Sequence, residues 1–432
     1  MSIEELYQLY QQHPTVSTDS RKIEEGCLFF ALKGDNFDGN QYALQAIEKG
    51  AAYAIIDNAS YAEGHRYVVV DDVLQTLQQL AHHHRLQFEI PVIAITGSNG
   101  KTTTKELVSN VMVSHYPTHF TKGNFNNHIG VPLTLLAMPS DTEVAIIEMG
   151  ANHVGEIDFL CKIAAPTHGI ITNVGNAHLE GFGSFEGVRL AKGELYRYLE
   201  QHRGVAFLNT DEDHLLEMSG WSLPKIFYSS SEDLNPKHPG FECQLIKSDP
   251  FLTVGFLGKQ GVVLPIQTQL MGLYNFNNIM TAIAVGKYFK VPPKRIQQAI
   301  EQYTPSNNRS QLKKIDSNTF LLDAYNANPS SMQKALESFA TYGAKKKIAI
   351  LGDMLELGSY SVTAHRDILF TANNLNIEVI TVGKEFLKVA NNNMQTFINV
   401  GALKQWFDEQ GFEDTFFLLK GSRGIKLEKL LG

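Results

Sequence analysis

The chain has 432 residues, of which 43% are hydrophobic and 19% are charged, and its formal net charge is −8. This length exceeds one typical hydrophobic core and predicts several globular domains, while the acidic balance argues against general binding to nucleic acid or to acidic membranes. The three cysteines, Cys27, Cys161 and Cys243, are widely spaced and odd in number, so they indicate neither a disulfide framework nor a zinc site.

The chain lacks the sequence features of exported and membrane proteins. Residues 1–5 do not form a basic region ahead of an apolar core, and no run approaches the roughly 20 apolar residues of a membrane-spanning helix. We therefore expect a cytoplasmic protein without membrane insertion. We also expect a monomer that binds no nucleic acid.

Residues 1–86 are predicted to form a small α/β domain. Turns rich in glycine and aspartate separate its three strand candidates, which are Cys27–Leu32, Tyr53–Ile56 and Tyr67–Val70. Val73–Arg85 has helical patterning and ends in His82-His83-His84. Consecutive histidines on a helix point in three directions, so we interpret them as a solvated helix end rather than a metal site.

Residues 87–304 are predicted to form a larger domain in which strands alternate with helices, the pattern of a parallel sheet covered on both faces. Its later strand candidates are Val144–Ile147, Gly169–Thr172 and Val205–Leu208. Phe251–Leu270 alternates like antiparallel strands, and Asn275–Lys290 is expected to be helical. Ligands of such sheets gather beyond the carboxyl ends of the strands, where polar residues follow.

An apolar run, Pro91–Ile95, opens this domain and leads into a glycine loop that ends in Lys101 and Thr102. Gly97 and Gly100 allow a tight turn whose N–H groups can point at phosphate oxygens, and the following helix adds its positive N-terminal end. Lys101 would reach the terminal phosphates, and the Thr102 hydroxyl would hold Mg²⁺. The spacing departs from GxxxxGK[ST], since Ile95 stands at the first glycine position. The alternative is an ordinary strand–turn–helix corner.

Three other polar residues in this domain could act on phosphates. Glu148 ends a strand expected beside the loop strand, which suits a Mg²⁺ ligand, although a strand-end glutamate can also bond to the following turn. His178 follows a similar strand and is equally compatible with an ordinary loop histidine. Lys192, taken alone, is a solvated helix lysine.

Residues 305–432 follow a polar linker and are predicted to form a third domain with a second strand–helix series. Its strand candidates are Thr319–Leu322, Lys347–Leu351, Val379–Val382 and Phe416–Leu419, each followed by a helical stretch. The segment has no Gly-x-Gly-x-x-Gly loop, so we do not expect a second nucleotide site there.

Over essentially its whole length, the chain resembles the Mur ligases, which build the peptidoglycan precursor needed for the cell wall, cell shape and division. The motifs that carry the resemblance, in order, are Thr96–Thr103, Glu148-Met149-Gly150, Asn173–His178, Ala191–Glu194, Asn275-x-x-Asn278 and Lys420–Gly424. The resemblance implies an α/β fold of three domains: a small UDP-substrate-binding N-terminal domain, a central P-loop ATPase domain with a parallel sheet, and a Rossmann-like C-terminal domain.

Within the family, Tyr325–Met332, Leu351–Gly358 and Lys420–Gly424 are similar to the branch that adds D-alanyl-D-alanine to UDP-N-acetylmuramoyl-tripeptide. The Asp-Asn-Pro-Arg motif usual in the diaminopimelate-adding branch does not occur. The resemblance therefore implies an ATP-dependent amide ligase that acts through an acyl phosphate and binds these two substrates. The third residue of the tripeptide, diaminopimelate or lysine, is left open.

The resemblance also implies roles for individual residues. Lys101, Lys192, His178 and Arg309 would be catalytic. Thr102 with Glu148 would hold one Mg²⁺, and His178 with a carbamylated Lys192 a second. ATP would be bound by Gly97, Ser98, Asn99, Gly100, Lys101, Thr102, Thr103, Asn275, Asn278, Arg309 and Asp323. The other substrates would be bound by Ser20, Arg21, Asn126, Asn127, Asn326, Asn328, Lys420, Ser422 and Arg423.

Three alternatives remain at this stage. Two are ligases: a different muramoyl ligase and an enzyme like folylpolyglutamate synthetase. The third is a P-loop regulatory protein that hydrolyses nucleotide without ligation, which would need neither His178 and Lys192 nor an amine-side domain.

Overall fold

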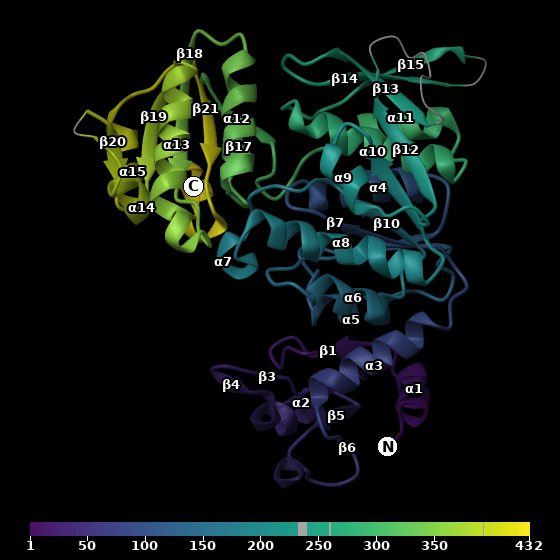
Figure 1. Ribbon diagram of the computed structural model, residues 1–432. Helices are drawn as coiled ribbons and strands as arrows, with labels where there is room; N and C mark the ends of the chain where they lie inside the picture. The colour runs from purple at the N-terminus through teal and green to yellow at the C-terminus, as the bar shows by residue number, and fades with distance from the viewer. Residues whose placement is uncertain (232–239, 259–260, 392) are drawn as a thin grey trace.

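The structure, a computed structural model, describes residues 1–231, 240–258, 261–391 and 393–432. Within these residues the strands form three main sheets of four, nine and six strands, plus a two-stranded hairpin. Figure 1 shows the three sheets in three bodies: the N-terminal body at the bottom, the central body at the upper right and the C-terminal body at the upper left. The predicted three-domain α/β fold is confirmed. In the described part of the chain, every helix is too short or too polar to span a bilayer.

The N-terminal body is built on a wholly parallel sheet in the order β1-β2-β5-β6. Its elements are α1 (Ile3–Gln12), β1 (Val16–Ser17), β2 (Leu28–Phe30), the hairpin β3 (Lys33–Gly34) and β4 (Phe37–Asp38), α2 (Ala43–Glu48), β5 (Tyr53–Ile56), β6 (Tyr67–Val69) and α3 (Val73–Arg85). All three predicted strands and the predicted helix are present. Helix α1 begins with a capping box between Ser2 and Glu5, which satisfies backbone N–H groups at its first turn.

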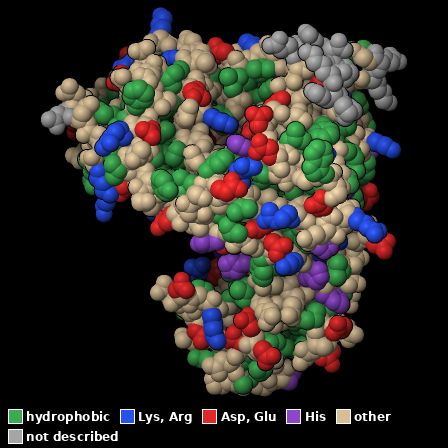
Figure 2. Space-filling model, in the orientation of Figure 1, with side chains coloured by type: hydrophobic (Ala, Val, Ile, Leu, Met, Phe, Trp, Pro, Cys, Tyr) green, Lys and Arg blue, Asp and Glu red, His purple; other side chains and the backbone are tan. Residues whose placement is uncertain are grey.

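Helix α3 joins the N-terminal body to the central body. It packs on α1 and also on α5 (Gly130–Leu136) and α6 (Glu156–Ala164), and one buried apolar cluster runs through both bodies, from Leu6 and Leu28 to Val92 and Leu135. Figure 2 shows that the N-terminal body otherwise projects freely, leaving a recess on the left of the view. A shared core of this kind makes the joint between the two bodies rigid.

The prediction of a solvated helix end at His82-His83-His84 is wrong. His84 is buried against Tyr7, whose hydroxyl lies 3.2 Å from its Nδ1, and His83 packs on the same ring. The Nδ1 of His82 hydrogen-bonds the Ile163 carbonyl of α6. The sequence could not show these contacts, because they depend on how α3 packs against α1 and α6.

Arg85 hydrogen-bonds the end of α3 to the end of α6, so a substitution of Arg85 tests this joint. Its buried guanidinium donates to the carbonyls of Ala164 (3.0 Å), Ala165 (3.1 Å) and Phe88 (2.7 Å). Because Arg85→Ala leaves these oxygens without their donors, we expect the free energy of unfolding to fall by about 2–4 kcal/mol in urea titrations. Arg366→Ala, at an exposed position on another helix, is the control and should cost about 0.5 kcal/mol or less. An Arg85 variant as stable as this control would contradict the assignment.

The central sheet has the order β15-β14-β13-β12-β11-β10-β7-β9-β8. Its strands are β7 (Val92–Thr96), β8 (Thr118–Phe120), β9 (Val144–Glu148), β10 (His168–Ile171), β11 (Val205–Asn209), β12 (Lys225–Ser230), β13 (Phe241–Lys247), β14 (Thr253–Leu257) and β15 (Val263–Gln267). The strand pairings from β8 to β13 are parallel, and the pairings of β14 with β13 and with β15 are antiparallel. The antiparallel strands predicted within Phe251–Leu270 are therefore confirmed. Residues 259 and 260 of that segment lie outside the described part.

Helices cover both faces of the central sheet, as the alternating pattern predicts. One buried cluster joins the sheet to α5, α6 and α8 (Phe185–Gln201), and another joins it to α4 (Lys101–Val113), α10 (Tyr274–Tyr288) and α11 (Pro293–Glu301). Two shorter helices, α7 (Leu179–Phe182) and α9 (Asp213–Met218), complete this body. The loop strand β7 lies in the sheet between β9 and β10, so its carboxyl end is flanked by the ends of both neighbours.

The C-terminal sheet has the order β16-β17-β21-β18-β19-β20 and is parallel except for β16. Its elements are β16 (Gln311–Ile315), β17 (Asn318–Asp323), α12 (Pro329–Thr341), β18 (Lys346–Gly352), α13 (Ser361–Asn374), β19 (Glu378–Val382), α14 (Lys384–Leu387), β20 (Gln395–Phe397), α15 (Val400–Glu409) and β21 (Thr415–Lys420). The four predicted strands are confirmed. The last of them is followed only by 3₁₀ turns, not by an α-helix.

Candidate active site

A cavity of about 590 Å³ opens where the central body meets the C-terminal body. Most of the predicted site residues line it: Ser98, Asn99, Gly100, Lys101, Thr102, Thr103, Asn126, Asn127, Glu148, His178, Asn275, Asn278, Arg309, Asp323, Asn326, Lys420, Ser422 and Arg423. Five predicted residues do not line it: Gly97, Lys192, Asn328, Ser20 and Arg21. The last two belong to the N-terminal body, and Arg21 is exposed there and paired with Asp19.

The loop between β7 and α4 has the tight geometry that its two glycines predict. Gly97 has a φ of +141°, and a Cβ there would lie 2.0 Å from the Thr172 hydroxyl oxygen. Gly100 has a φ of +79° at the N-cap of α4, and a Cβ there would lie 2.6 Å from Asn278 Oδ1. Only glycine fits at both positions without displacing a neighbour. The loop therefore brings its backbone close to the strand ends on either side.

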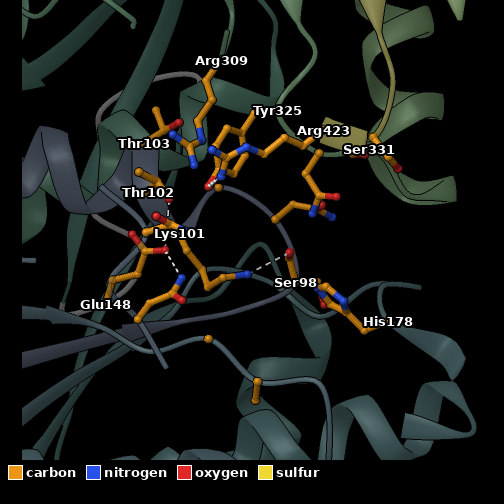
Figure 3. Close-up of a pocket in the computed structure, with 18 of the residues that line it drawn as sticks. Ser98, Lys101, Thr102, Thr103, Glu148, His178, Arg309, Tyr325, Ser331 and Arg423 are labelled. Atoms are coloured by element: carbon orange, nitrogen blue, oxygen red, sulfur yellow. Dashed lines mark hydrogen bonds between the residues drawn. The ribbon is translucent and has the colours of Figure 1, made fainter. Parts of the chain in front are cut away.

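Lys101 lies over this loop. Its Nζ donates to the carbonyl oxygens of Gly97 (2.7 Å) and Ser98 (3.2 Å), and Figure 3 shows the side chain extended toward Ser98. Burial lowers the pKa of Lys101, while the nearby Glu148 carboxylate acts in the opposite direction. The ammonium is thus held at the cavity wall, partly shielded from water, which strengthens its attraction for an anionic ligand.

Glu148 lies where the sequence predicts, at the end of β9 and beside β7, with Ile95 opposite it in the sheet. Its Oε1 accepts hydrogen bonds from the Thr102 hydroxyl (3.1 Å) and the Asn126 amide (2.8 Å). Its Oε2 is buried and has no hydrogen-bond partner among the described residues. A buried carboxylate oxygen without a partner is costly unless a cation takes it up, so this oxygen and the Thr102 hydroxyl suit a hard divalent ion such as Mg²⁺.

The structure does not bring His178 and Lys192 into contact. His178, with a positive φ, pairs with Glu356 of the C-terminal body, and this bond lowers the pKa of Glu356. Lys192 is buried on α8, where its Nζ donates to the Ala151 carbonyl at 3.4 Å. The Phe182 ring packs near both side chains. Burial holds the pKa of Lys192 well below its ordinary value, and the expectation of a solvated lysine, drawn from that residue alone, is wrong.

Asn275 and Asn278 form one network with the phosphate-loop helix. Asn278 accepts from the Thr104 hydroxyl (3.0 Å) and donates to Asn275 Oδ1 (2.9 Å). Asn275 in turn donates to the Met271 carbonyl and to Ser310 Oγ. These contacts fix both amides against α4, at the edge of the cavity.

The C-terminal wall of the cavity carries cations arranged around one aromatic ring. The Arg309 guanidinium lies 3.5 Å from the centre of the Tyr325 ring, and that of Arg423 lies 5.3 Å from it. Figure 3 shows all three side chains facing Lys101 and Thr102. Lys420 and Asp323, which were predicted to bind different ligands, form an ion pair at 2.6 Å in which Lys420 is buried and Asp323 is partly buried.

Contacts between polar side chains hold the C-terminal body against the phosphate loop. Asn328, the N-cap of α12, donates to Asn99 Oδ1 at 2.8 Å, and Ser330 Oγ accepts from the Asn176 amide at 3.1 Å. The sequence-based assignment gave no role to Tyr325 or Glu356, although both lie in motifs that carry the family resemblance. Their position in those motifs was the available signal.

Comparisons with known proteins identify the family. Three sequence models match consecutive parts of the chain: "Mur ligase family, catalytic domain" (residues 14–85), "Mur ligase middle domain" (95–286) and "Mur ligase, glutamate ligase domain" (308–415). The chain is 36% identical to the UDP-N-acetylmuramoyl-tripeptide--D-alanyl-D-alanine ligase of Bacillus subtilis over 96% of this chain and 92% of that protein. The chain belongs to the Mur ligase family.

Other members of the family give the same result. The ligase of the same name from Escherichia coli is 32% identical, over 96% of this chain and 92% of that protein. A crystal structure of MurF from Acinetobacter baumannii superposes with a TM-score of 0.86 at 30% identity, covering 100% of this chain and 97% of that one. MurF from Thermotoga maritima, solved in complex with ADP, has a TM-score of 0.84 at 24% identity over 97% of this chain and 96% of that one, which shows the shared fold.

Proposed function

We propose that this Mur ligase uses ATP to join D-alanyl-D-alanine to UDP-N-acetylmuramoyl-tripeptide, giving UDP-N-acetylmuramoyl-pentapeptide for peptidoglycan synthesis. The observation that carries the proposal is the composition of one cavity. The phosphate loop with Lys101, the buried Glu148 and the guanidinium groups of Arg309 and Arg423 all face it. The similarity to D-alanyl-D-alanine-adding enzymes over nearly the full chain supports the choice of substrates.

The chemistry requires activation of an acid, because a carboxylate does not react with an amine at neutral pH. An oxygen of the tripeptide's terminal carboxylate attacks the γ-phosphorus of ATP, the bond to ADP breaks, and an acyl phosphate forms. Lys101 and Arg309 stabilise the negative charge that spreads over the phosphoryl oxygens. The dipeptide amine, having lost a proton, then attacks the acyl carbon, and the tetrahedral intermediate expels phosphate to leave the new amide.

We assign the first Mg²⁺ to Thr102 and Glu148, whose unpartnered Oε2 fits a cation. When bound, the ion would neutralise negative charge on the phosphates of ATP. The second site, His178 with a carbamylated Lys192, stays a prediction. It is compatible with the burial of Lys192, since a buried amine can react with CO₂ to give a carboxylate-like ligand. Glu356 engages only Nδ1 of His178, and a metal-ligating histidine commonly pairs its other ring nitrogen with a carboxylate in this way.

We assign the remaining groups by the family resemblance; all of them line the cavity except Ser20, Arg21 and Asn328. Asn275, Asn278 and Asp323 serve the nucleoside of ATP; Asn126 and Asn127 serve the muramoyl peptide; Ser20 and Arg21 serve its uridine end; Asn326, Asn328, Lys420, Ser422 and Arg423 serve the dipeptide. Among the last group, Ser422 acts indirectly, since its hydroxyl accepts from the Leu355 amide. We propose the bounds predicted from the sequence for the three domains: 1–86 for the N-terminal, 87–304 for the central and 305–432 for the C-terminal domain. The expectations of a monomer and of a cytoplasmic location remain predictions.

Phosphate release from Mg-ATP, with each substrate omitted in turn and the product weighed, tests the proposal. We expect release only when UDP-N-acetylmuramoyl-tripeptide and D-alanyl-D-alanine are both present, with the pentapeptide as product, because the acyl phosphate forms on one and reacts with the other. Steady release without either substrate would support the P-loop hydrolase. Release with a different amine would instead indicate another branch of the family.

A further inference from the structure

Glu356 stands out among the acidic side chains that line the cavity, which are Glu148, Glu156, Asp323 and Glu356. Glu148 is bound by Thr102 and Asn126, Asp323 is bound by Lys420, and both oxygens of Glu156 are bound by groups of Asn152 and His153. Glu356 has only its Oε2 engaged, by His178, and its side chain is 59% exposed. Glu148 Oε2 also lacks a partner but is buried and suits a metal ion, so Glu356, the most exposed of these four carboxylates, is the one open to a ligand that enters the cavity.

The loop that carries Glu356 is held in place by buried contacts. Asp353 accepts hydrogen bonds from the amides of Glu385 and Phe386 at 2.9 Å, and the Met354 amide donates to His365 Nε2 at 3.0 Å. Glu356 itself has a φ of +65°, a left-handed conformation that is unfavourable for glutamate. Surrounding structure that maintains a strained residue in a cavity wall is characteristic of functional positions.

Glu356 and Arg423 lie on neighbouring loops. The Leu355 amide donates to Ser422 Oγ at 2.9 Å. Glu356 follows Leu355 in the chain and Arg423 follows Ser422, so this hydrogen bond joins the two loops next to the two charged residues. A Cβ on Gly424 would lie 2.9 Å from Leu355 Cδ1, which confirms how closely the two loops approach. The wall thus carries one carboxylate and one exposed guanidinium on adjoining loops, a pattern complementary to a small zwitterion.

We propose that Glu356 binds the α-ammonium group of the incoming dipeptide, while Arg423 takes its carboxylate. This inference rests on the proposed function and adds the residue that orients the attacking nitrogen. A carboxylate hydrogen-bonded to the ammonium fixes the position of that nitrogen near the activated acyl carbon before the proton is lost. His178, on the central body, holds the other oxygen of the same carboxylate and so limits its rotation.

Steady-state kinetics of Glu356→Gln tests the inference. The amide keeps the size of the side chain but loses its charge, so we expect KM for D-alanyl-D-alanine to rise at least about tenfold, while KM for ATP and for the UDP substrate change less than twofold. Glu356→Asp, which keeps the charge on a shorter side chain, should give an intermediate KM. Glu180→Gln is the matched control, because Glu180 is an exposed neighbour that does not line the cavity.

A binding experiment isolates the charge of the ligand. With UDP-N-acetylmuramoyl-tripeptide and a non-hydrolysable ATP analogue present, the wild type should bind D-alanyl-D-alanine at least about tenfold more tightly than N-acetyl-D-alanyl-D-alanine, whose nitrogen is uncharged. Glu356→Gln should remove this preference.

An unchanged preference, an unchanged KM for the dipeptide, or an equal rise in KM for all three substrates would overturn the inference. The last of these results would identify Glu356 as an interdomain contact for His178. Failure of the wild type to release phosphate in response to the dipeptide would instead overturn the proposed function.

Discussion

Alanine at Lys101 is expected to lower kcat for dipeptide-dependent phosphate release by about 10³-fold. Lys101 is the ammonium that lies over the phosphate loop, and the site it occupies is partly closed to water. A positioned charge acts on the transition state for phosphoryl transfer more strongly than on bound ATP, because negative charge on the transferring group is stabilised there without reorganisation of solvent. The loss should therefore appear mainly in kcat and less in KM for ATP.

The control for this prediction is Lys162→Ala, which removes an exposed lysine paired with Asp158 on α6. This variant should retain wild-type kcat. The melting temperature of the Lys101 variant should stay within a few degrees of the wild type, since its main contacts are with loop carbonyls. A Lys101→Ala enzyme that kept more than about a tenth of wild-type kcat would show that this lysine does not stabilise the transition state.

Glutamine at Glu148 is expected to lower kcat by about 10²-fold or more and to raise the Mg²⁺ concentration needed for half-maximal activity about tenfold. The substitution can preserve the bonds to Thr102 and Asn126, but it replaces the anionic, unpartnered Oε2 with a neutral group that binds divalent ions poorly. The measurement is phosphate release over a range of Mg²⁺ concentrations at saturating substrates.

Glu143→Gln is a matched control for Glu148→Gln, because Glu143 is exposed next to the opposite end of the same strand. Its Mg²⁺ dependence should equal that of the wild type. If the Glu148 variant also kept the wild-type Mg²⁺ dependence, the first metal site would have to be assigned to other residues.

The sequence was sufficient to locate groups whose position depends on local structure. A strand followed by Gly97, Gly100 and Lys101 defines its own loop, and the parallel pattern places the carboxyl end of β9 at the same edge of the sheet as that loop. Glu148 is therefore found beside Thr102, as predicted. The same reasoning located the individually predicted strands to within one or two residues, but it did not find β1, β8, β12, β13, β16 or β20, which lie toward the edges of the sheets.

What the sequence could not show depends on how separate bodies meet. The pairing of His178 with Glu356 and the contact of His82 with the Ile163 carbonyl each require two bodies to be placed against each other, and no periodicity in the chain encodes that placement. The ion pair between Lys420 and Asp323 joins adjacent strands of one sheet, β21 and β17, which are distant in the chain. Motif resemblance assigned these two residues to different ligands because it treats each motif separately.

The core that α3 shares between the N-terminal and central bodies has a consequence for the choice of substrate. A rigid joint keeps a constant separation between the proposed uridine site at Ser20 and Arg21 and the phosphate loop at Lys101. A muramoyl peptide whose uridine end is bound at that site can then reach the phosphate loop only if its length matches this separation. A muramoyl peptide of the right length presents its terminal carboxylate to the γ-phosphate, whereas a shorter one stops before reaching it. If Ser20 and Arg21 bind the uridine as proposed, this constant separation favours a peptide of one length before any side chain of the peptide is recognised.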